Sequence, residues 1–234
     1  MRVGIIGAGN MGSAFARRLS AAGHDVLITS KEVEEARQVA QSLGGSTRAV
    51  PPQQLAEGVE IVIAATPYEH QVDALRGSGR LDGKTVIEIS NPLKPDMSGL
   101  IVGHTTSAAE EVAKAVPGAR VVKAFNTVFA QILGAPPVSA DGARVQVFYA
   151  SDDTNAKDAV RALIDSMSFE PVDAGPLSNA RYLEPLGMLN IYFGYVAKLG
   201  TEIAPAMRKV PATQTRQATQ AAAKDTSRRP EARP

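Results

Sequence analysis

Residues 1–14 read MRVGIIGAGNMGSA, and this stretch decides the fold of the chain. The apolar run at 2–6 predicts a buried strand that leads directly into three glycines, Gly7, Gly9 and Gly12. Their spacing, G-x-G-x-x-G, is typical of turns that hold a dinucleotide. A glycine triplet alone is a weak signal in a chain with 20 glycines, so the neighbouring residues must decide its meaning.

The residues after the glycines supply the context that such a turn requires. A helix is predicted from about Met11 to Ala22, and a second strand follows over 25–29. In this arrangement the first glycine permits a tight turn, the second lets the backbone approach a pyrophosphate, and the third lets the helix pack on the strand. The amide groups that open the helix then meet the phosphates. The alternative is a glycine-rich turn without a ligand, which this context disfavours.

Short apolar runs and helix-like stretches alternate over the first two thirds of the chain. Further strands are predicted at 60–65, 84–90, 120–124, 144–149 and near Pro171–Asp173. Further helices are predicted at about 32–43, 69–75, 107–115 and 154–167. Strands that alternate with helices favour a parallel sheet that is covered on both faces. We therefore expect an α/β fold, a Rossmann doubly wound parallel sheet with a small, largely helical C-terminal annex.

The stretch 177–200, LSNARYLEPLGMLNIYFGYVAKLG, differs from the rest because it is apolar on nearly every side. We expect a helix here, with Ser178 as its N-cap and with a bend or an interruption at Pro185. A helix that is apolar all round has to be buried all round. We therefore expect a partner subunit, a bound ligand or both to cover it.

The chain is expected to divide into three segments. Residues 1–142 form the predicted dinucleotide-binding Rossmann domain. Residues 143–205 form an α/β extension with helices that complete an acceptor cleft and make the dimer contact. Residues 206–234 are rich in Ala, Gln, Thr, Arg and Lys, so they cannot form an apolar core and are expected to be a disordered basic tail.

The overall composition is that of an ordinary globular chain and argues against several classes of function. The net charge of +1 disfavours nucleic-acid binding through bulk electrostatics. The absence of cysteine excludes disulfides, thiolate metal ligands and thiol nucleophiles. The three histidines, His24, His70 and His104, lack metal-ligand spacing, so we expect no metal site. No apolar run approaches the roughly 20 residues that span a membrane, so we expect a cytoplasmic location.

The end of the second strand bears on the choice between NAD and NADP. NAD enzymes usually end this strand with an acid for the ribose 2′-hydroxyl, whereas the 2′-phosphate of NADP favours positive charge. Here Ser30 and Lys31 follow the strand, which favours NADP. The alternative is that Ser30 caps the next helix and that Lys31 is a solvated surface lysine. Three nearby acids oppose a phosphate, namely Glu32, Glu34 and Glu35.

Several separate motifs point to one family when they are taken together. They are GIIGAGNMGSAFARRL at 4–19, TSK at 29–31, ATPYEH at 65–70, VVKAFNTVFA at 121–130 and DAGPLSNARYLEPLGMLNI at 173–191. In this combination the chain resembles the F420-dependent NADP oxidoreductase family over roughly residues 1 to 200. It also resembles the cytosolic reductase domain of the STEAP metalloreductases. The glycine motif by itself is shared with the pyrroline-5-carboxylate reductases, whereas KAFNT and DAGPLSNAR are more specific.

The resemblance implies that NADP(H) is the cofactor and that coenzyme F420 or a flavin, FMN or FAD, is the acceptor. The residues implied to bind the cofactor are Gly7, Ala8, Gly9, Asn10, Met11, Gly12, Ser30, Lys31, Thr66, Pro67, His70, Gln71, Asn91, Pro92, Phe125 and Asn126. Those implied to line the acceptor cleft are Met188, Asn190 and Leu199. Two positions depart from the family pattern: Asn126 stands where the F420 enzymes carry a histidine, and Glu35 stands where a basic residue often follows.

We therefore predict hydride transfer between NADP(H) and a small-molecule acceptor, F420 or a flavin. Because the cofactor carries the hard chemistry, the chain has to stack two rings and exclude water, and no catalytic side chain is assigned. One alternative is an NADP-dependent reductase of a small imine or carbonyl substrate. Another is a non-catalytic NADP(H)-binding sensor, for which the basic tail is the only support. We expect a homodimer, with neither nucleic acid nor membrane as a partner.

Overall fold

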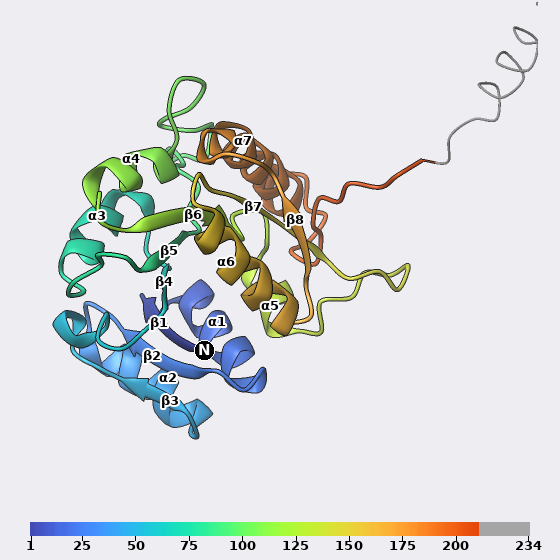
Figure 1. Ribbon diagram of the computed structural model, residues 1–234. Coiled ribbons are helices and arrows are strands. Elements are labelled where there is room, and N and C mark those ends of the chain that lie inside the picture. The colour runs from blue at the N-terminus through green and yellow to red at the C-terminus, as the bar shows by residue number, and fades with distance from the viewer. Residues whose placement is uncertain (211–234) are drawn as a thin grey trace, which may run out of the picture.

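The computed structural model describes residues 1–210, and most of the predicted basic tail, at 211–234, lies outside the described part. An eight-stranded sheet has the order β3-β2-β1-β4-β5-β6-β7-β8 (Figure 1). Its strands are β1 (Arg2–Ile6), β2 (Asp25–Thr29), β3 (Thr47–Ala49), β4 (Ile61–Ala64), β5 (Thr85–Glu88), β6 (Arg120–Ala124), β7 (Gln146–Ala150) and β8 (Glu170–Asp173). The α-helices are α1 (Asn10–Ala21), α2 (Val33–Leu43), α3 (Tyr68–Arg76), α4 (Ala108–Ala115), α5 (Ala130–Gly134), α6 (Thr154–Ser166) and α7 (Ala180–Ile191). Three short helical turns are η1 (Pro52–Gln54), η2 (Leu177–Asn179) and η3 (Tyr192–Val196).

The first six strands pair in parallel, which confirms the expected Rossmann arrangement. The chain winds outward from β1 through β2 to β3, returns to β4 beside β1, and then winds outward in the other direction. The strand order therefore switches between β1 and β4. Ligands of open α/β sheets bind at the carboxyl ends of the strands beside such a switch point. The glycine turn follows β1, so it lies at this position.

The expected parallel pairing holds for every pair of neighbouring strands but one, because β7 runs antiparallel to β6. The segment between these strands contains only α5, a helix of five residues. A parallel connection needs a crossover that carries the chain back to the opposite edge of the sheet, usually on a full helix. The chain here instead re-enters the sheet from the edge at which β6 ends. After α6 has supplied a full crossover, β8 pairs in parallel with β7.

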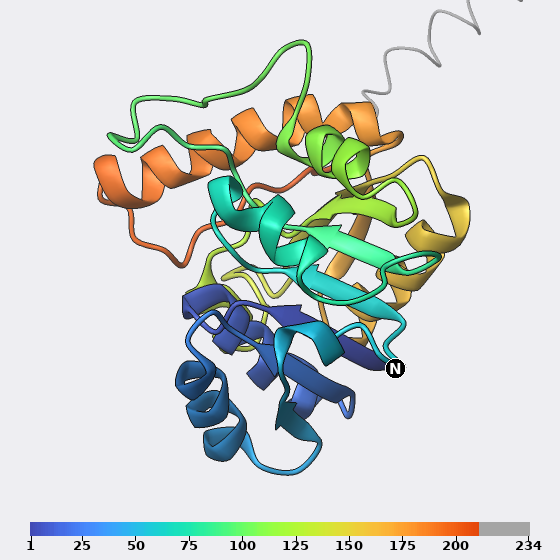
Figure 2. The same ribbon diagram turned by 90° about the vertical axis from the view of Figure 1, so that its left-hand side faces the viewer.

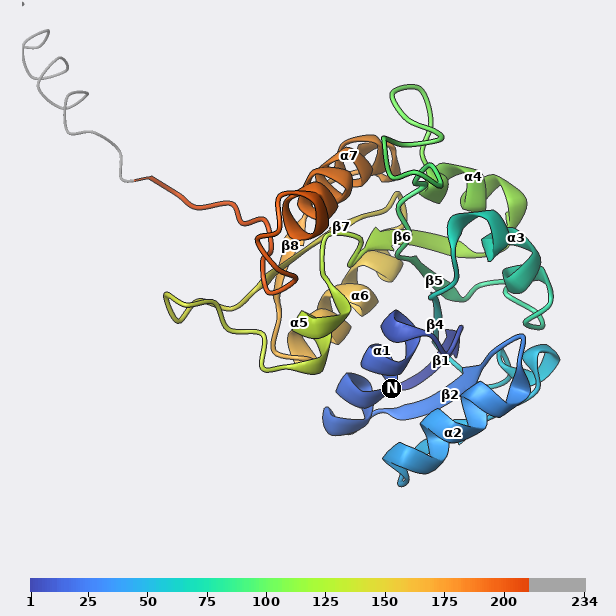
Figure 3. The same ribbon diagram turned by 180° about the vertical axis from the view of Figure 1, so that it is seen from behind.

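Helices cover both faces of the sheet, and each face has its own apolar core (Figures 1 and 3). On one face, Phe15 of α1 and Leu163 of α6 pack with Ile5 of β1. On the other face, Leu75 of α3 packs with Val62 of β4, together with residues of α4. Successive strand residues alternate between the two cores, as the pleat of a sheet requires. This burial on both faces explains why the strands read as continuous apolar runs.

The C-terminal helix α7 differs from its prediction in two respects. Ser178 is not its N-cap, because the chain forms the short turn η2 first and Asn179 takes the capping position without a capping side chain. Pro185 lies inside α7, which continues to Ile191. Within the described chain Tyr182 is 74% exposed and Leu189 is 49% exposed, so the expected cover by a partner or a ligand stays a prediction. In Figure 2 this helix crosses above the ends of the central strands.

Strands β7 and β8 extend the same sheet as the first six strands. The predicted segments 1–142 and 143–205 therefore share one sheet, and the division between them stays a prediction. Within residues 1–210, no helix combines the length and the apolar character that crossing a membrane requires.

Candidate active site

The glycine turn joins β1 to α1, and each glycine meets a different requirement. Gly7 has a φ of +105°, and its N–H donates to the Thr29 carbonyl oxygen at 2.8 Å. A Cβ at Gly12 would lie 1.9 Å from the Gly7 carbonyl oxygen, so only glycine lets α1 pack this closely. At Gly9, no described atom lies within 4 Å of a Cβ position. The backbone at Gly9 is therefore open to a ligand.

The first turn of α1 suits an anionic group. This helix begins at Asn10, and among the described residues it has neither a capping side chain nor an acid in its first turn. The first amide groups of a helix lack partners within the helix, and this end carries partial positive charge. A pyrophosphate would satisfy these amide groups and be stabilised by the charge.

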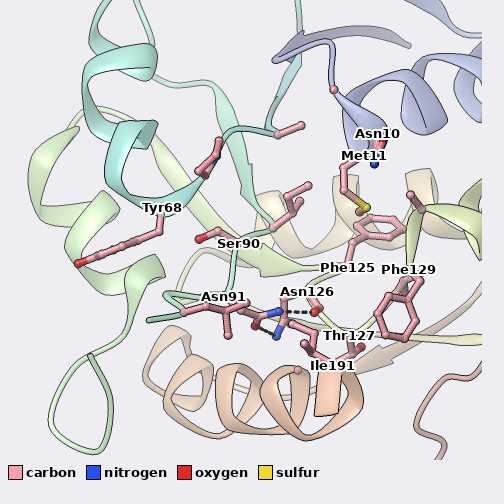
Figure 4. A pocket seen from close by; sticks show the side chains of 18 of the residues that line it. Asn10, Met11, Tyr68, Ser90, Asn91, Phe125, Asn126, Thr127, Phe129 and Ile191 are labelled. Carbon is pink, nitrogen blue, oxygen red and sulfur yellow. Dashed lines mark hydrogen bonds between the residues drawn. The ribbon is translucent and has the colours of Figure 1, made fainter. Parts of the chain in front are cut away.

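A cavity of about 590 Å³ opens at this turn and follows the ends of β1, β4, β5 and β6 to α7 (Figure 4). Strand ends, the glycine turn and α7 each contribute to its wall. The wall includes Gly9, Asn10, Met11, Thr66, Pro67, Tyr68, Ser90, Asn91, Phe125, Asn126, Thr127, Phe129, Gly187, Asn190, Ile191 and Tyr195. The cavity thus connects the predicted pyrophosphate position with the C-terminal helix.

Two asparagines join the strand ends to α7 at the centre of this cavity. Asn126 donates from Nδ2 to Asn91 Oδ1 at 2.9 Å and to the Leu183 carbonyl oxygen at 2.7 Å. Asn91 donates from Nδ2 to the Asn126 carbonyl oxygen at 2.8 Å. A Cβ at Gly187 would lie 2.5 Å from Asn91 Oδ1, so the absence of a side chain there lets α7 approach the pair. The position of Asn126 is thereby fixed from three directions.

Three buried polar atoms on the cavity wall have no hydrogen-bond partner within the described residues. They are Thr66 Oγ1, Ser90 Oγ and Asn126 Oδ1. Buried polar groups are nearly always satisfied, and an unsatisfied one costs about 1–3 kcal/mol. Two hydroxyls and one amide oxygen can together donate and accept hydrogen bonds. A polar ligand with both kinds of group, such as a ribose with a carboxamide-bearing ring, therefore fits this part of the wall.

Phe125 makes the turn that directs Asn126 and the following residues into the cavity. It is fully buried and has a φ of +61°, a region that non-glycine residues rarely adopt. Its ring packs edge-on against Phe15 and Phe169, with ring centroids 5.0 and 6.1 Å apart. Such backbone strain persists where the surroundings enforce it, and it clusters at functional sites. The two aromatic contacts hold this turn in place.

A buried ionic cluster lies directly beneath the cavity. Lys123 Nζ donates to Glu88 Oε2 at 2.5 Å, to Glu184 Oε1 at 2.9 Å and to the Ser90 carbonyl oxygen at 2.5 Å. The side chains of Lys123 and Glu88 are 0% exposed, and that of Glu184 is 1% exposed. Gln71 adds a hydrogen bond to Glu88 at 2.9 Å. The cluster therefore links β5, β6, α3 and α7.

The environment of Glu184 explains how a second carboxylate can be buried beside one lysine. Burial raises the pKa of Glu184, while Lys123 opposes this effect. The backbone N–H groups of Ala108 and Ala109, at the start of α4, also donate to Glu184 at 3.1 and 3.3 Å. The N-terminal end of a helix stabilises negative charge. The carboxylate of an α7 residue is therefore held jointly by β6 and α4.

The cluster was missed in the sequence analysis, although a signal was present. Glu88 and Lys123 each interrupt an apolar run, and they are register partners on adjacent strands. Tyr68 was also missed. Its hydroxyl donates to Glu111 Oε2 at 2.5 Å, and burial, followed by this hydrogen bond, raises the pKa of Tyr68 to about 12.

Some residues implied to bind the cofactor lie together on the cavity wall, and others do not. The wall includes Gly9, Asn10, Met11, Thr66, Pro67, Asn91, Phe125 and Asn126. Gly7, Ala8, Gly12, His70, Gln71 and Pro92 do not line it. His70 is exposed on the outside of α3, whereas Gln71 turns inward to Glu88. Their roles in binding a cofactor stay predictions.

The three residues implied to line the acceptor cleft are divided by the structure. Asn190 lines the main cavity, and its Nδ2 donates to the Thr127 carbonyl oxygen at 3.1 Å. Leu199 instead lines a separate apolar cavity of about 310 Å³, whose wall Asn190 also joins, and Met188 lines neither cavity. Leu199 lies beyond the end of α7, and the side chains of Met188 and Asn190, two positions apart on the helix, point in different directions.

Ser30 and Lys31 lie at the tip of β2, outside the main cavity. The alternative in which Ser30 caps α2 is wrong, because Glu32 takes the N-cap position and no side chain caps the helix. The Ser30 hydroxyl instead donates to Glu35 Oε2 at 2.8 Å. Lys31 is exposed.

Comparisons with known proteins agree with this geometry. The family described as NADP oxidoreductase coenzyme F420-dependent matches residues 2–92. The F420-dependent NADP reductase of Methanothermobacter marburgensis is 30% identical over 214 residues, which cover 82% of this chain and 91% of that protein. A crystal structure from Arthrobacter sp. FB24, assigned as an F420-dependent NADP reductase, is 26% identical with a TM-score of 0.79 and covers 88% of this chain and 99% of that one.

The metalloreductase STEAP3 of Rattus norvegicus is 32% identical over 190 residues, or 80% of this chain. The chain spans only 37% of the length of that relative. The Methanothermobacter protein, by contrast, is matched over nearly its whole length. The resemblance inferred from the motifs is confirmed, and the chain belongs to the coenzyme F420-dependent NADP oxidoreductase family, a family of NADP-dependent oxidoreductases.

Proposed function

We propose that the chain transfers a hydride between NADP(H) and a deazaflavin acceptor of the coenzyme F420 type. The observation that carries this proposal is the single cavity that runs from the glycine turn to α7. One end presents helix amides for phosphate, the middle presents unsatisfied polar atoms, and the far end presents aromatic and aliphatic walls. This order matches a dinucleotide whose nicotinamide meets a second ring system.

The proposed cofactor end comprises Gly9, Asn10 and Met11. The open backbone at Gly9 and the uncapped start of α1 support a pyrophosphate there. The middle comprises Thr66, Ser90 and Asn126, whose unsatisfied atoms support a ribose and a carboxamide. Each of these assignments is a proposal about a residue that lines the cavity.

The proposed acceptor end lies between the segment after β6 and α7. Phe129 and Tyr195 pack edge-on there with ring centroids 5.6 Å apart, and Ile191 lines the same wall. Apolar walls exclude water and strengthen the interactions of a bound polar ring. Gly187 keeps α7 close to the centre of the cavity. These residues would confine a planar acceptor against the cofactor.

When bound, NADPH would supply a hydride, which the acceptor would take together with one proton from the medium. The side chains of the site have three tasks, which are to bind, to orient and to exclude water. Asn91 and Asn126 fix the wall at which the two rings would meet. The strained turn at Phe125 presents Asn126 to the cavity. Correct positioning of two reactants alone lowers a barrier by roughly 7–11 kcal/mol.

The test is to follow the nicotinamide absorbance band of NADPH with purified full-length protein. Oxidised F420, FMN, FAD and ferric chelates are offered in turn. We expect NADPH to be oxidised with F420 at least about tenfold faster than with any of the others, since binding of the correct ring decides orientation. Binding of NADPH without turnover of any acceptor would favour the sensor function instead. Faster turnover of ferric chelates would favour a metalloreductase.

We further propose that the protein acts as a homodimer in the cytoplasm. Support for the dimer comes from the exposed apolar side chains on α7 and η3, which include Tyr182, Leu189, Tyr192 and Tyr195. Contiguous apolar patches of this kind often mark interfaces. Support for the cytoplasm comes from NADP(H), which is an intracellular compound. Light scattering on the purified protein tests the dimer, and a single subunit mass would contradict it.

A further inference from the structure

The tip of β2 lies beside the glycine turn, where a Rossmann fold meets the adenosine ribose of its cofactor. Ile6 of β1 is the register partner of Thr29 of β2, and Gly7 donates to the Thr29 carbonyl oxygen. Ser30 is the next residue and is only 7% exposed. A residue at this tip reads whether the ribose carries a 2′-hydroxyl or a 2′-phosphate.

The Ser30 side chain has one hydrogen to donate, and Glu35 accepts it. The Ser30 hydroxyl donates to Glu35 Oε2 at 2.8 Å. A serine hydroxyl has one hydrogen to donate and two lone pairs that accept, and an ionised carboxylate only accepts. The pair therefore offers acceptors to a ligand. A ribose 2′-hydroxyl can donate to them, whereas a 2′-phosphate brings only further acceptors and negative charge.

The tip of β2 carries charges of both signs, and most of them are negative. Glu32, Glu34 and Glu35 stand at the start of α2, and Arg37 is paired with Glu34 at 3.5 Å. Lys31 is the cation next to Ser30, and it is exposed. An exposed lysine side chain can reach a phosphate, but it would do so against the adjacent carboxylates. At the tip of β2, Lys31 therefore favours NADP, whereas Glu35 favours NAD.

We propose that Glu35 is a specificity-determining residue, and that through Ser30 it lets this chain bind NADH as well as NADPH. The proposal rests on the proposed function, because it assumes that the glycine turn holds the pyrophosphate of a nicotinamide cofactor. Lys31 serves the 2′-phosphate of NADPH, and the pair formed by Glu35 and Ser30 serves the 2′-hydroxyl of NADH.

The experiment measures the dissociation constants of NADPH and NADH by nicotinamide fluorescence, without any acceptor. It compares the natural chain with Glu35→Gln and with the matched control Glu34→Gln. The control removes the same charge one residue away, from a side chain that is 63% exposed and paired with Arg37. We expect the natural chain to bind the two cofactors within about tenfold of each other.

We expect Glu35→Gln to shift the affinity ratio about tenfold toward NADPH, because it removes one charge that faces a phosphate in a water-like dielectric. Glu34→Gln should leave the ratio within about twofold of the natural value. A natural preference for NADPH above a hundredfold, or equal shifts in the two variants, would overturn the proposal while leaving the proposed function intact. Binding of neither cofactor would overturn both.

Discussion

Replacement of Lys123 by methionine tests how strongly the buried ionic cluster holds the site together. Methionine keeps much of the length and volume of the lysine side chain but removes its charge. The change leaves Glu88 and Glu184 as two carboxylates with side chains at most 1% exposed. Removing one partner of a buried ion pair typically costs about 3–5 kcal/mol. We expect a loss of this size in the free energy of unfolding at pH 7.

Glu88 and Glu184 keep other hydrogen bonds after the substitution, and these limit the loss of stability. Glu88 keeps Gln71 at 2.9 Å and the Ser90 N–H at 2.7 Å, and Glu184 keeps the N–H groups of Ala108 and Ala109. These are hydrogen bonds from neutral groups, so neither carboxylate retains a cationic partner. For a chain of this size, about 3–5 kcal/mol corresponds to a fall in melting temperature of roughly 10 °C.

The loss should depend on pH, because folding raises the pKa of Glu184. Protonation of Glu184 therefore favours the folded state, and this stabilisation is complete below the ordinary pKa of the carboxyl group and is lost as pH rises through the raised value. Lys123 lowers the pKa of Glu184, so removal of Lys123 raises the pKa of Glu184 in the folded state further. We expect the destabilisation at pH 5 to be about 1 kcal/mol smaller than at pH 7.

The assay is urea unfolding of the purified chain, followed by far-ultraviolet circular dichroism at both pH values. Lys114→Met is the matched control, since Lys114 is exposed on α4. The double variant Lys123→Met with Glu184→Gln should recover part of the stability, because one of the two unpaired carboxylates is removed, and it keeps the test valid if the single variant does not fold. A loss below about 1 kcal/mol, or one equal to that of Lys114→Met, would refute the reasoning.

Four further changes test the site itself. Gly12→Ala should destabilise the fold by at least about 3 kcal/mol, because its Cβ would lie 1.9 Å from a backbone oxygen; an unchanged melting temperature would contradict this. Gly9→Ala, where a Cβ meets no described atom within 4 Å, should instead keep the melting temperature and raise the dissociation constant of NADPH at least about tenfold. Gly187→Ala would place a Cβ 2.5 Å from Asn91 Oδ1, so we expect turnover with F420 to fall at least about tenfold while NADPH binding changes less than about threefold. Lys31→Asp should weaken NADPH about tenfold more than NADH, and equal effects on both would show that Lys31 does not contact the 2′-phosphate.

The sequence was sufficient for the Rossmann part of the fold because its signals are local. The apolar runs at β1, β2 and β6 were predicted with the bounds that the structure has. The glycine spacing located the turn, and the structure gives each glycine a separate steric reason. The short elements β3, η1 and α5 were missed, since three to five residues are too few to display a period.

The direction of β7 could not be predicted from its residues. A strand has the same apolar pattern in either direction, and only the length and helix content of its connection distinguish the two. The covering of α7 by a partner or a ligand stays a prediction for a related reason. An all-round apolar pattern is the same whether every side is buried within one chain or one side is left for a partner. In the described chain, Tyr182 and Tyr195 remain largely exposed.

The candidate site was only partly predictable, because its wall combines residues that are far apart in sequence. Asn91 and Asn126 were singled out from motifs, but their mutual hydrogen bonds arise from the ends of β5 and β6. Glu184 meets Lys123 only because α7 packs over the sheet. Pairings of this kind depend on register and packing, which composition and period do not encode.

The most direct test of the proposed function is the fate of deuterium carried at C4 of the nicotinamide. NADPH labelled there on either face is oxidised by the full-length protein in ordinary water with F420 as acceptor. Direct transfer across one cavity predicts that label from one of the two faces, and not from the other, appears on the ring carbon of reduced F420, where it does not exchange with solvent. Reduced F420 that carries only hydrogen from the solvent, or no oxidation of NADPH, would contradict the account.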